Sequence, residues 1–210
     1  RNIIDNKIEN KEIIIIDDNS FDGTKEILEE LSKDLDIKVL TNVKNYGKGY
    51  CLRRGFDSAT GEIILIHDAD LEYDVLDHIN ILKPIMSGKA DVVYGSRFIG
   101  SEPKRVVYFW NRLANFILTN LCNIILNLSM TDVYTCLKAF KKKDIDNIKL
   151  YENRFGIEPE ITFKLAYQNL IFYEVGIHYH GRTYSEGKKI RWYDGLLALK
   201  AIIKYSFLRK

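Results

Sequence analysis

Two stretches of sequence decide the fold: Glu12-Ile-Ile-Ile-Ile-Asp-Asp18 and Glu62-Ile-Ile-Leu-Ile-His-Asp-Ala-Asp70. Each is a short aliphatic run that ends in carboxylates, and such runs are typical of strands buried on both faces. Ligands of open α/β sheets bind beyond the carboxyl ends of the strands, so both acidic clusters are expected at the functional edge. The alternative for the first cluster is that Asp17 caps the helix that follows it.

Helical and strand-like segments alternate around these two runs. Apolar side chains at helical spacing predict helices, and β-branched runs predict further strands. The expected helices are Thr24–Leu35, Tyr50–Ala59 and Asp74–Met86, and the further strands are Asp91–Tyr94 and Leu170–Val175. This order predicts an α/β fold with a mostly parallel sheet and helices on both faces.

Length and composition exclude some classes of protein. The 210 residues suit one domain, and 31 Lys and Arg against 29 Asp and Glu give a net charge of only +2, which does not indicate a nucleic-acid partner. The three cysteines are scattered and lack metal-ligand spacing, as expected in a reducing compartment. We therefore expect a cytoplasmic protein.

A long apolar helix is expected over Val106–Leu128. The uncharged stretch Leu113–Thr131, which overlaps most of this helix, is long enough for a membrane span. A polar residue recurs at every fourth position, however, which makes a narrow stripe along one side of the helix. The stripe consists of Asn111, Asn115, Thr119, Asn123 and Asn127. We therefore interpret this helix as mostly buried in protein or lying at a membrane surface.

The C-terminal part is expected to differ from the rest. Residues Tyr179–Ile190 are rich in Gly, Arg and Lys and predict a flexible loop, and Trp192–Leu208 predicts an amphipathic helix. The domain organisation that follows is a main domain over residues 1–190 and a C-terminal helix over residues 191–210. Basic and apolar residues in that helix suit contact with an anionic membrane surface.

Three carboxylates at alternating positions follow the second strand. Asp68, Asp70 and Glu72 can point to one side and share a hard cation such as Mg²⁺ or Mn²⁺, which takes oxygen ligands. A metal there would stabilise the charge that grows on a leaving diphosphate.

An ordered set of motifs resembles glycosyltransferase family 2, and within it the dolichol-phosphate mannose synthase branch. The motifs are Glu12-Ile-Ile-Ile-Ile-Asp-Asp-Asn-Ser20 with Asp22-Gly-Thr24, Asn45-Tyr-Gly-Lys-Gly49, Asp68-Ala-Asp70, Gly95-Ser-Arg97, Thr131-Asp132 with Lys138-Ala-Phe140, and Gly181-Arg-Thr-Tyr-Ser-Glu-Gly-Lys-Lys189. The resemblance covers nearly the whole chain in the family's order. It implies a GT-A fold over residues 1–190, from which the family's first strand is expected to be missing.

The resemblance also implies an inverting transfer from a nucleotide diphosphate sugar of the GDP-mannose or UDP-glucose type. Asp18 would contact the base, Asp68 the ribose or the metal, and Asp70 with Glu72 the metal. The remaining expected donor-side residues are Asp17, Lys48, Arg182 and Lys189.

The acceptor is expected to be a polyprenyl phosphate on the cytoplasmic face of a membrane. A phosphomonoester is already an anion at neutral pH, so its site needs cationic side chains to position it more than a base to activate it. Arg97 and Arg112 are the candidates, because Arg112 begins an apolar helix. Two alternatives stay open: a sugar-hydroxyl acceptor with Asp132 or Glu160 as base, and a non-catalytic nucleotide-sugar binding or anchoring protein.

Overall fold

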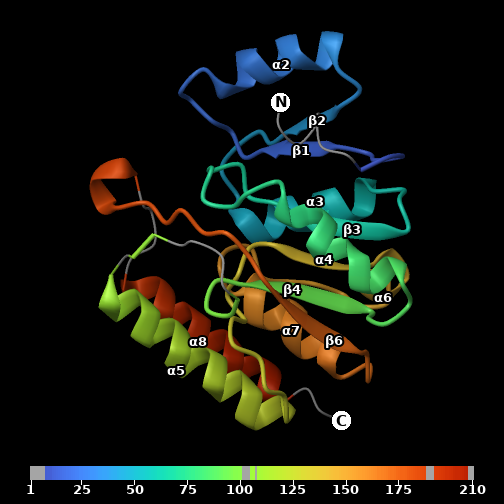
Figure 1. Ribbon diagram of the computed structural model, residues 1–210. Helices are drawn as coiled ribbons and strands as arrows, with labels where there is room; N and C mark the ends of the chain where they lie inside the picture. Colours follow the sequence, from blue (N-terminus) through green and yellow to red (C-terminus); the bar gives the residue numbers. More distant parts are fainter. Residues whose placement is uncertain (1–7, 101–104, 107, 188–191, 208–210) are drawn as a thin grey trace.

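The computed structural model describes residues 8–100, 105–106, 108–187 and 192–207 (Figure 1). Its strands form two groups, a parallel pair and a four-stranded sheet. They are β1 (Ile14–Asp17), β2 (Lys38–Thr41), β3 (Ile63–Ile66), β4 (Val92–Ser96), β5 (Lys138–Lys141) and β6 (Phe172–Gly176). Strands β1 and β2 pair with each other, and the larger sheet has the order β3-β5-β4-β6.

The direction of the strands agrees with the predicted fold. Strand β6 runs parallel to β4, and β3 and β4 both run antiparallel to β5, which lies between them. Only β5 therefore opposes its neighbours in the four-stranded sheet. In the described residues no strand hydrogen-bonds to both β1 and β3, so the parallel pair and the larger sheet are separate.

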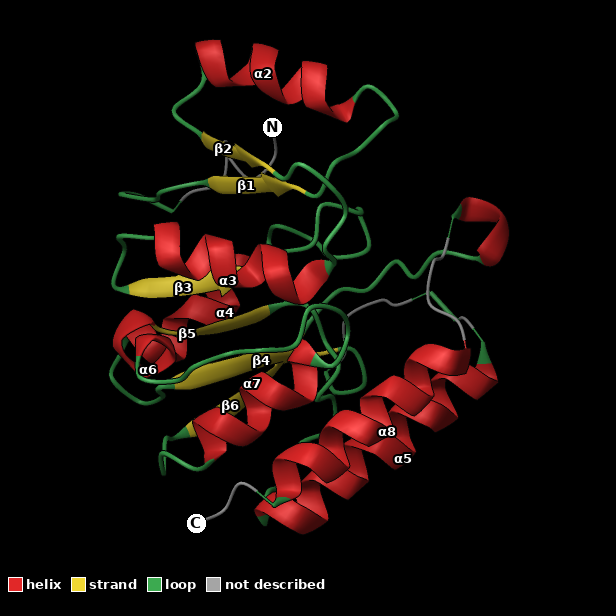
Figure 2. Cartoon of the chain, turned by 180° about the vertical axis from the view of Figure 1, so that it is seen from behind, coloured by secondary structure: helices red, strands yellow, loops and turns green. Residues whose placement is uncertain are grey.

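Helices cover both sides of the larger sheet, as predicted (Figure 2). The helices are α2 (Thr24–Asp34), α3 (Lys48–Ser58), α4 (Asp77–Met86), α5 (Phe109–Leu126), α6 (Lys142–Asp146), α7 (Ile157–Ala166), α8 (Trp192–Ser206) and the 3-10 turn η1 (Tyr184–Glu186). Helices α5 and α8 lie side by side next to α7 (Figures 1 and 2).

The core is divided by the sheet into two clusters. Successive side chains of a strand point to opposite faces, so Val92 and Tyr94 of β4 pack with α7 and α8, whereas Val93 packs with α4. Ile161 and Ile202 belong to the first cluster and are almost completely buried. Burial on both faces explains why β4 is apolar along its first three residues.

The long apolar helix and the C-terminal loop were predicted approximately. Helix α5 occupies the centre of the predicted range, and no helix among the described residues is long and apolar enough to cross a membrane. The expected loop contains the bridge Tyr73–Tyr179 and the turn η1, in which Thr183 and Glu186 cap each other reciprocally. Residues 179–187 are thus mostly loop, as predicted, with one bridge and one 3-10 turn.

Two glycines of α3 allow a test of how this helix packs against residues 152–153. A Cβ atom at Gly49 would lie 2.1 Å from the carbonyl oxygen of Glu152, whereas one at Gly55 would lie 3.4 Å from the Cδ1 atom of Ile16. We expect Gly49→Ala to destabilise the protein by about 1–3 kcal/mol, because backbone must move to remove the overlap. Gly55→Ala is the matched control and should stabilise by up to about 1 kcal/mol through helix propensity. Urea denaturation measures both, and equal midpoints would contradict the packing.

Candidate active site

A chain of alternating charges lies inside the protein at the end of β3. The ammonium of Lys138 contacts the carboxylate of Glu158, whose Oε1 atom lies 2.9 Å from Nζ of Lys48. The same Nζ atom lies 2.9 Å from Oδ2 of Asp68. Lys138 is fully buried and Glu158 nearly so, and pairing of this kind is what makes buried charge tolerable.

The pKa values follow from burial and pairing. Burial alone raises the pKa of Glu158, but Lys138 and Lys48 outweigh it and hold that pKa below its ordinary value. Asp68 behaves likewise, since Lys48 outweighs burial and lowers its pKa. Burial raises the pKa of the neighbouring Cys136 thiol to about 12, so this cysteine is protonated at neutral pH. Asp68 is therefore an anion at the end of the strand.

Asp70 and Glu72 share one cationic partner, Arg182. The Nη2 atom of Arg182 lies 2.8 Å from Oδ2 of Asp70, and its Nε atom lies 3.2 Å from Oε1 of Glu72. The backbone N–H of Arg182 also donates to Glu72 at 2.9 Å, and the hydroxyl of Tyr179 donates to the same carboxylate at 3.1 Å. Burial raises the pKa of Asp70. These contacts attach the loop after β6 to the acidic segment after β3.

The three expected metal ligands are not gathered into one cluster. Asp68 faces Lys48, while Asp70 and Glu72 face Arg182, and among the described residues no group of three His, Cys, Asp or Glu side chains is arranged to hold a metal ion. The geometric reason lies at Leu71, whose φ of 61° breaks the extended alternation on which the prediction relied.

Asp18 organises the loop that carries Lys48. Its carboxylate accepts hydrogen bonds from the side chain of Asn42 at 2.6 Å and from the backbone N–H groups of Tyr46 and Gly47 at 2.9 and 2.7 Å. Burial raises the pKa of Asp18, but these donors outweigh it and lower the pKa. Asp17 accepts from the N–H of Ser20 at 3.2 Å, so it caps the turn after β1 rather than the start of α2.

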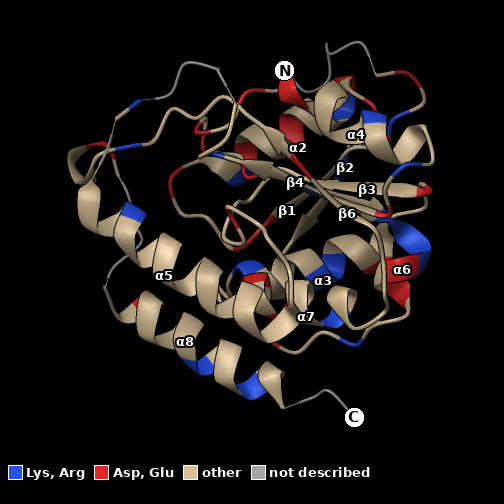
Figure 3. Cartoon of the chain, turned by 60° about the horizontal axis from the view of Figure 1, so that its bottom comes forward, with Lys and Arg blue, Asp and Glu red and all other residues tan. Residues whose placement is uncertain are grey.

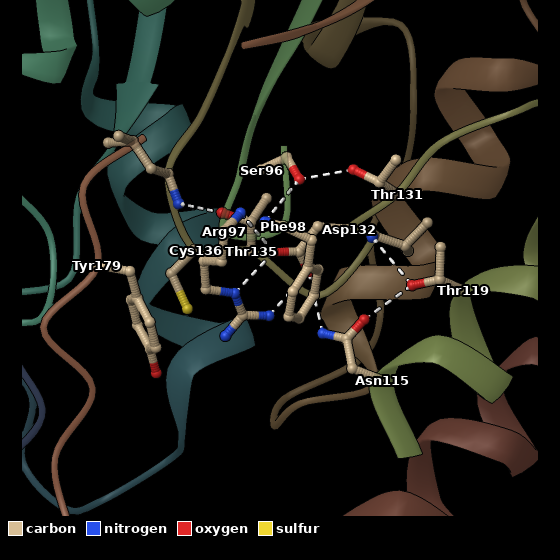
Figure 4. Close-up of polar contacts among 12 residues, drawn as sticks. Ser96, Arg97, Phe98, Asn115, Thr119, Thr131, Asp132, Thr135, Cys136 and Tyr179 are labelled. Carbon is tan, nitrogen blue, oxygen red and sulfur yellow. Dashed lines mark hydrogen bonds and ion pairs between the residues drawn. The ribbon is translucent and has the colours of Figure 1, made fainter. Parts of the chain in front are cut away.

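Arg97 and Asp132 form a bidentate pair at the end of β4 (Figure 4). The Nε and Nη2 atoms of Arg97 donate to the two carboxylate oxygens of Asp132 at 2.6 and 2.8 Å, and the backbone N–H of Arg97 donates at 3.1 Å. Asn115 of α5 adds a fourth donor at 3.0 Å. Asp132 is fully buried, and the pair raises the pKa of Arg97 even though burial lowers it.

Arg112 lies on α5, and its side chain approaches the same ring, that of Phe98, as the side chain of Arg97. The guanidinium carbon of Arg112 lies 5.8 Å from the centre of that ring and the one of Arg97 lies 5.6 Å from it. Beside Arg112 is a cavity of about 490 Å³ with both apolar and polar walls. It is lined by Phe98, Arg112, Phe116, Thr119, Asn120, Asn123, Leu128, Ser129, Met130 and Thr131. Both expected acceptor arginines therefore lie near Phe98, and Arg112 also lines the cavity.

Glu160 is engaged by the protein itself. It accepts from the backbone N–H groups of Tyr151 and Glu152 and pairs with Lys164 of its own helix, so it holds the loop before α7. Lys189 lies outside the described residues. Glu158 was not among the expected site residues, and Lys138 was expected only as part of a family motif. No hydrophobic pattern in the sequence marks either residue as buried.

Comparison with known proteins agrees with this geometry. Residues 1–149 match the sequence model of Glycosyl transferase family 2. The chain belongs to glycosyltransferase family 2. The resemblance found in the motifs is therefore confirmed, and the non-catalytic alternative has less support than a glycosyltransferase.

Curated relatives are similar over most of this chain, but it spans only about half of the length of two of them. It is 28% identical to the dolichol-phosphate mannosyltransferase of Pyrococcus furiosus over 89% of this chain, but spans only 54% of that protein. It is 27% identical to glycosyltransferase AglJ of Haloferax volcanii over 73% of this chain and 49% of that protein.

A solved structure shows the same fold. Glucosyl-3-phosphoglycerate synthase from Mycobacterium tuberculosis, in complex with Mn²⁺, UDP-glucose and phosphoglyceric acid, matches with a TM-score of 0.67. The match covers 94% of this chain and 69% of that chain at 15% identity. The fold class expected from the sequence is confirmed by this likeness.

The buried charges of this glycosyltransferase predict a strong effect of Glu158→Gln. The change leaves Lys48 and Lys138 around a neutral amide, and breaking such a buried pair costs about 3–5 kcal/mol. The paired variant Glu158→Gln/Lys138→Met removes one uncompensated charge and should recover part of the loss. Guanidinium denaturation at neutral pH measures both, and a double variant no more stable than the single one would contradict the pairing.

The same variant carries a pH dependence. The pKa of Glu158 is lowered in the folded protein, so its contribution to stability is fully present above its ordinary value of 4.5 and is lost as pH falls through the folded pKa. The stability difference between the natural protein and Glu158→Gln should therefore shrink only below about pH 4.5. An unchanged difference at lower pH, where the fold persists, would be inconsistent with this.

Proposed function

We infer that this glycosyltransferase transfers a hexose, with inversion, from a nucleotide diphosphate sugar to a polyprenyl phosphate at the cytoplasmic face of a membrane. The observation that carries the inference is the Asp132 carboxylate, which accepts three hydrogen bonds from Arg97 and one from Asn115. A carboxylate held in this way is poorly placed to take a proton from a sugar hydroxyl. A phosphate acceptor needs no such base.

On the donor side, the residues nearest to the end of β3 and the loop before α3 would bind the nucleotide sugar. Asp18 shapes that loop, Lys48 and Asp68 lie at its base, and Arg182 approaches from the other side. Lysine and arginine at such a position neutralise diphosphate oxygens. The GDP-mannose or UDP-glucose type of donor is the proposal, in keeping with the names of the relatives.

A divalent cation, Mg²⁺ or Mn²⁺, would be held by Asp68, Asp70 and Glu72. All three are carboxylates, and hard cations take oxygen ligands, but each now faces a cationic side chain, so a bound metal would have to replace Lys48 and Arg182 as their partner. Asp70 and Glu72 already converge on one cationic group, the guanidinium of Arg182. When bound, such a metal supplies Lewis-acid stabilisation of the leaving diphosphate.

On the acceptor side, Arg97 and Arg112 would bind the phosphate. Both lie near the ring of Phe98, and the cavity beside Arg112 offers apolar surface from Phe116, Leu128 and Met130. A lipid phosphate presents charge and hydrocarbon next to each other, so this combination of guanidinium and apolar wall suits it. Arg97 reaches the site with its position already fixed by Asp132.

The outer faces of α5 and α8 support contact with a membrane surface (Figure 3). Helix α5 contains no acidic residue, and the acidic residue of α8, Asp194, is buried. Large apolar side chains are exposed on both helices, and Arg112 and Lys200 are exposed with them. The apolar residues are Phe109, Trp110, Phe116, Ile117, Ile124, Tyr193, Leu196, Leu197 and Ile203. An apolar face with basic residues favours an anionic lipid interface.

Metal dependence can be measured without turnover. We expect Mn²⁺ to bind the protein in the presence of a nucleoside diphosphate, and Asp70→Asn to weaken that binding by about tenfold or more, because it removes a charged oxygen ligand. Electron paramagnetic resonance of Mn²⁺ measures the affinity. Asp91→Asn, which alters a carboxylate paired with Lys141 away from the site, is the control. Equal Mn²⁺ affinity of both variants would exclude the proposed ligand.

The acceptor assignment predicts a specific defect in Arg112→Ala. A charge-assisted hydrogen bond contributes about 1.5–3 kcal/mol, so turnover with polyprenyl phosphate should fall roughly tenfold to a hundredfold. Donor affinity, measured by calorimetry, should stay within about twofold, because Arg112 is not on the donor side. Normal turnover with polyprenyl phosphate in Arg112→Ala, or a defect confined to donor affinity, would refute the phosphate acceptor. Asp132→Asn does not separate the two readings, because Asp132 also holds Arg97.

Membrane contact predicts that one exposed apolar residue matters and another does not. Ile124 of α5 is 78% exposed and Ile27 of α2 is 59% exposed. Ile124→Glu should weaken binding to anionic vesicles roughly tenfold, since it removes apolar burial and adds repulsion. Ile27→Glu, on a helix away from α5 and α8, should leave binding unchanged. Vesicle sedimentation compares the two, and identical binding would argue against this face.

A further inference from the structure

The polar stripe of α5 faces the protein, and two of its residues form hydrogen bonds with the loop over residues 130–133. The side chain of Asn123 donates to the carbonyl of Met130 at 2.7 Å and accepts from its N–H at 3.0 Å. One turn closer to the N-terminus, the hydroxyl of Thr119 accepts from the N–H of Val133 at 3.3 Å. These contacts satisfy the backbone of residues 130–133 and fix this loop along α5. Asn123 and Thr119 thus contact the backbone of this loop. A residue of the stripe that contacts a side chain of the candidate site would influence that site more directly.

Asn115 is that member (Figure 4). Its Nδ2 atom donates to Oδ1 of Asp132 at 3.0 Å, and its Oδ1 atom accepts from the hydroxyl of Thr119 at 3.0 Å. The second hydrogen bond orients the amide, because only with Oδ1 toward Thr119 does Nδ2 point to Asp132. Asn115 is thus held on one side by its own helix and bonds a buried carboxylate on the other.

Asp132 passes this constraint to Arg97. Arg97 supplies three of the four donors to the carboxylate, and Asn115 supplies the one that comes from a different element. The backbone of Asp132 is held separately, by the carboxylate of Glu174 at 3.0 Å. The side chain of Asp132 therefore links a residue at the end of β4 to α5. Arg112 lies on the same helix, three positions before Asn115, and so on the same side of it.

We propose that Asn115 is a positioning residue that, through Asp132, holds the Arg97 guanidinium at a fixed place relative to α5 and so sets its separation from Arg112. The link to the reaction rests on the proposed function, in which the two arginines bind one acceptor phosphate. Two guanidinium groups on different elements bind one phosphate well only if their separation is fixed beforehand.

The position of Arg97 can be followed without the reaction, by the rate at which its Nε–H exchanges with water in nuclear magnetic resonance of ¹⁵N-arginine-labelled protein. Loss of a hydrogen bond to a charged group frees the carboxylate, so Asn115→Ala should accelerate this exchange about tenfold. Thr119→Val, which keeps the volume but loses the hydroxyl that orients the amide, should accelerate it about threefold. Asn123→Ala is the matched control from the same stripe: it should lower the thermal midpoint but leave the Arg97 exchange unchanged.

Kinetics with a soluble short-chain polyprenyl phosphate form the second arm. We expect Asn115→Ala to raise the KM for the acceptor about tenfold, with donor affinity within about twofold of the natural protein. Faster Arg97 exchange with an unchanged acceptor KM would support the positioning role and overturn the acceptor assignment of Arg97. Unchanged exchange in Asn115→Ala, or in Thr119→Val if Asn115→Ala does not fold, would overturn the proposal.

Discussion

The rest of the structure depends on the ion pair between Lys48 and Asp68, with Glu158 on the other side of the same ammonium. Lys48 is the first residue of α3, Asp68 follows β3, Glu158 lies in the first turn of α7, and Lys138 begins β5. Four elements that are far apart in the sequence therefore meet at one row of opposite charges. Because an unpaired charge is costly inside a protein, each element is held in the place where its charge is compensated. The end of β3, where chemistry is expected, is thereby held by ion pairs to the protein interior rather than by surface contacts.

The proposed donor and acceptor sides are built in the same way around this row. Asp18 holds the loop before α3 through backbone donors, and Asp132 holds Arg97 through a bidentate pair. In both places the sequence suggested a carboxylate that could contact a substrate, but hydrogen bonds from the protein itself engage it. Each carboxylate therefore positions another part of the protein. This preorganisation is what a transfer between two charged substrates requires, since the positions of cations determine where phosphate oxygens lie. Arg112, which is exposed on α5, differs from these residues because it lies at the boundary between the site and the apolar face.

The sequence predicted the strands that end in carboxylates and the helices between them, because period and β-branching report burial directly. It did not predict β5, since Lys138-Ala-Phe-Lys141 has lysine at both ends and resembles a surface segment. Only the contact with Glu158 makes burial of Lys138 possible, and a contact between residues far apart in sequence leaves no local pattern. The same limit applies to the metal ligands. Asp68, Asp70 and Glu72 were expected to share a face, but the left-handed backbone at Leu71 and the competing cations Lys48 and Arg182 are set by tertiary structure.

The pairing of Asp68 with Lys48, and of Asp70 and Glu72 with Arg182, determines the charge at the end of β3. This charge affects how a substrate of the proposed reaction would bind. Two cations, Lys48 and Arg182, face three carboxylates, so the group is slightly negative before a substrate arrives. A nucleotide diphosphate brings further negative charge into a partly desolvated place, where repulsion between like charges is strong. Lys48 cannot compensate it alone, because Asp68 and Glu158 already share its charge. A divalent cation held by Asp68, Asp70 and Glu72 would restore the balance, and the guanidinium of Arg182 would then be available to phosphate oxygens. We therefore expect the metal and the donor to bind together and with mutual reinforcement, because each compensates the charge that opposes the other.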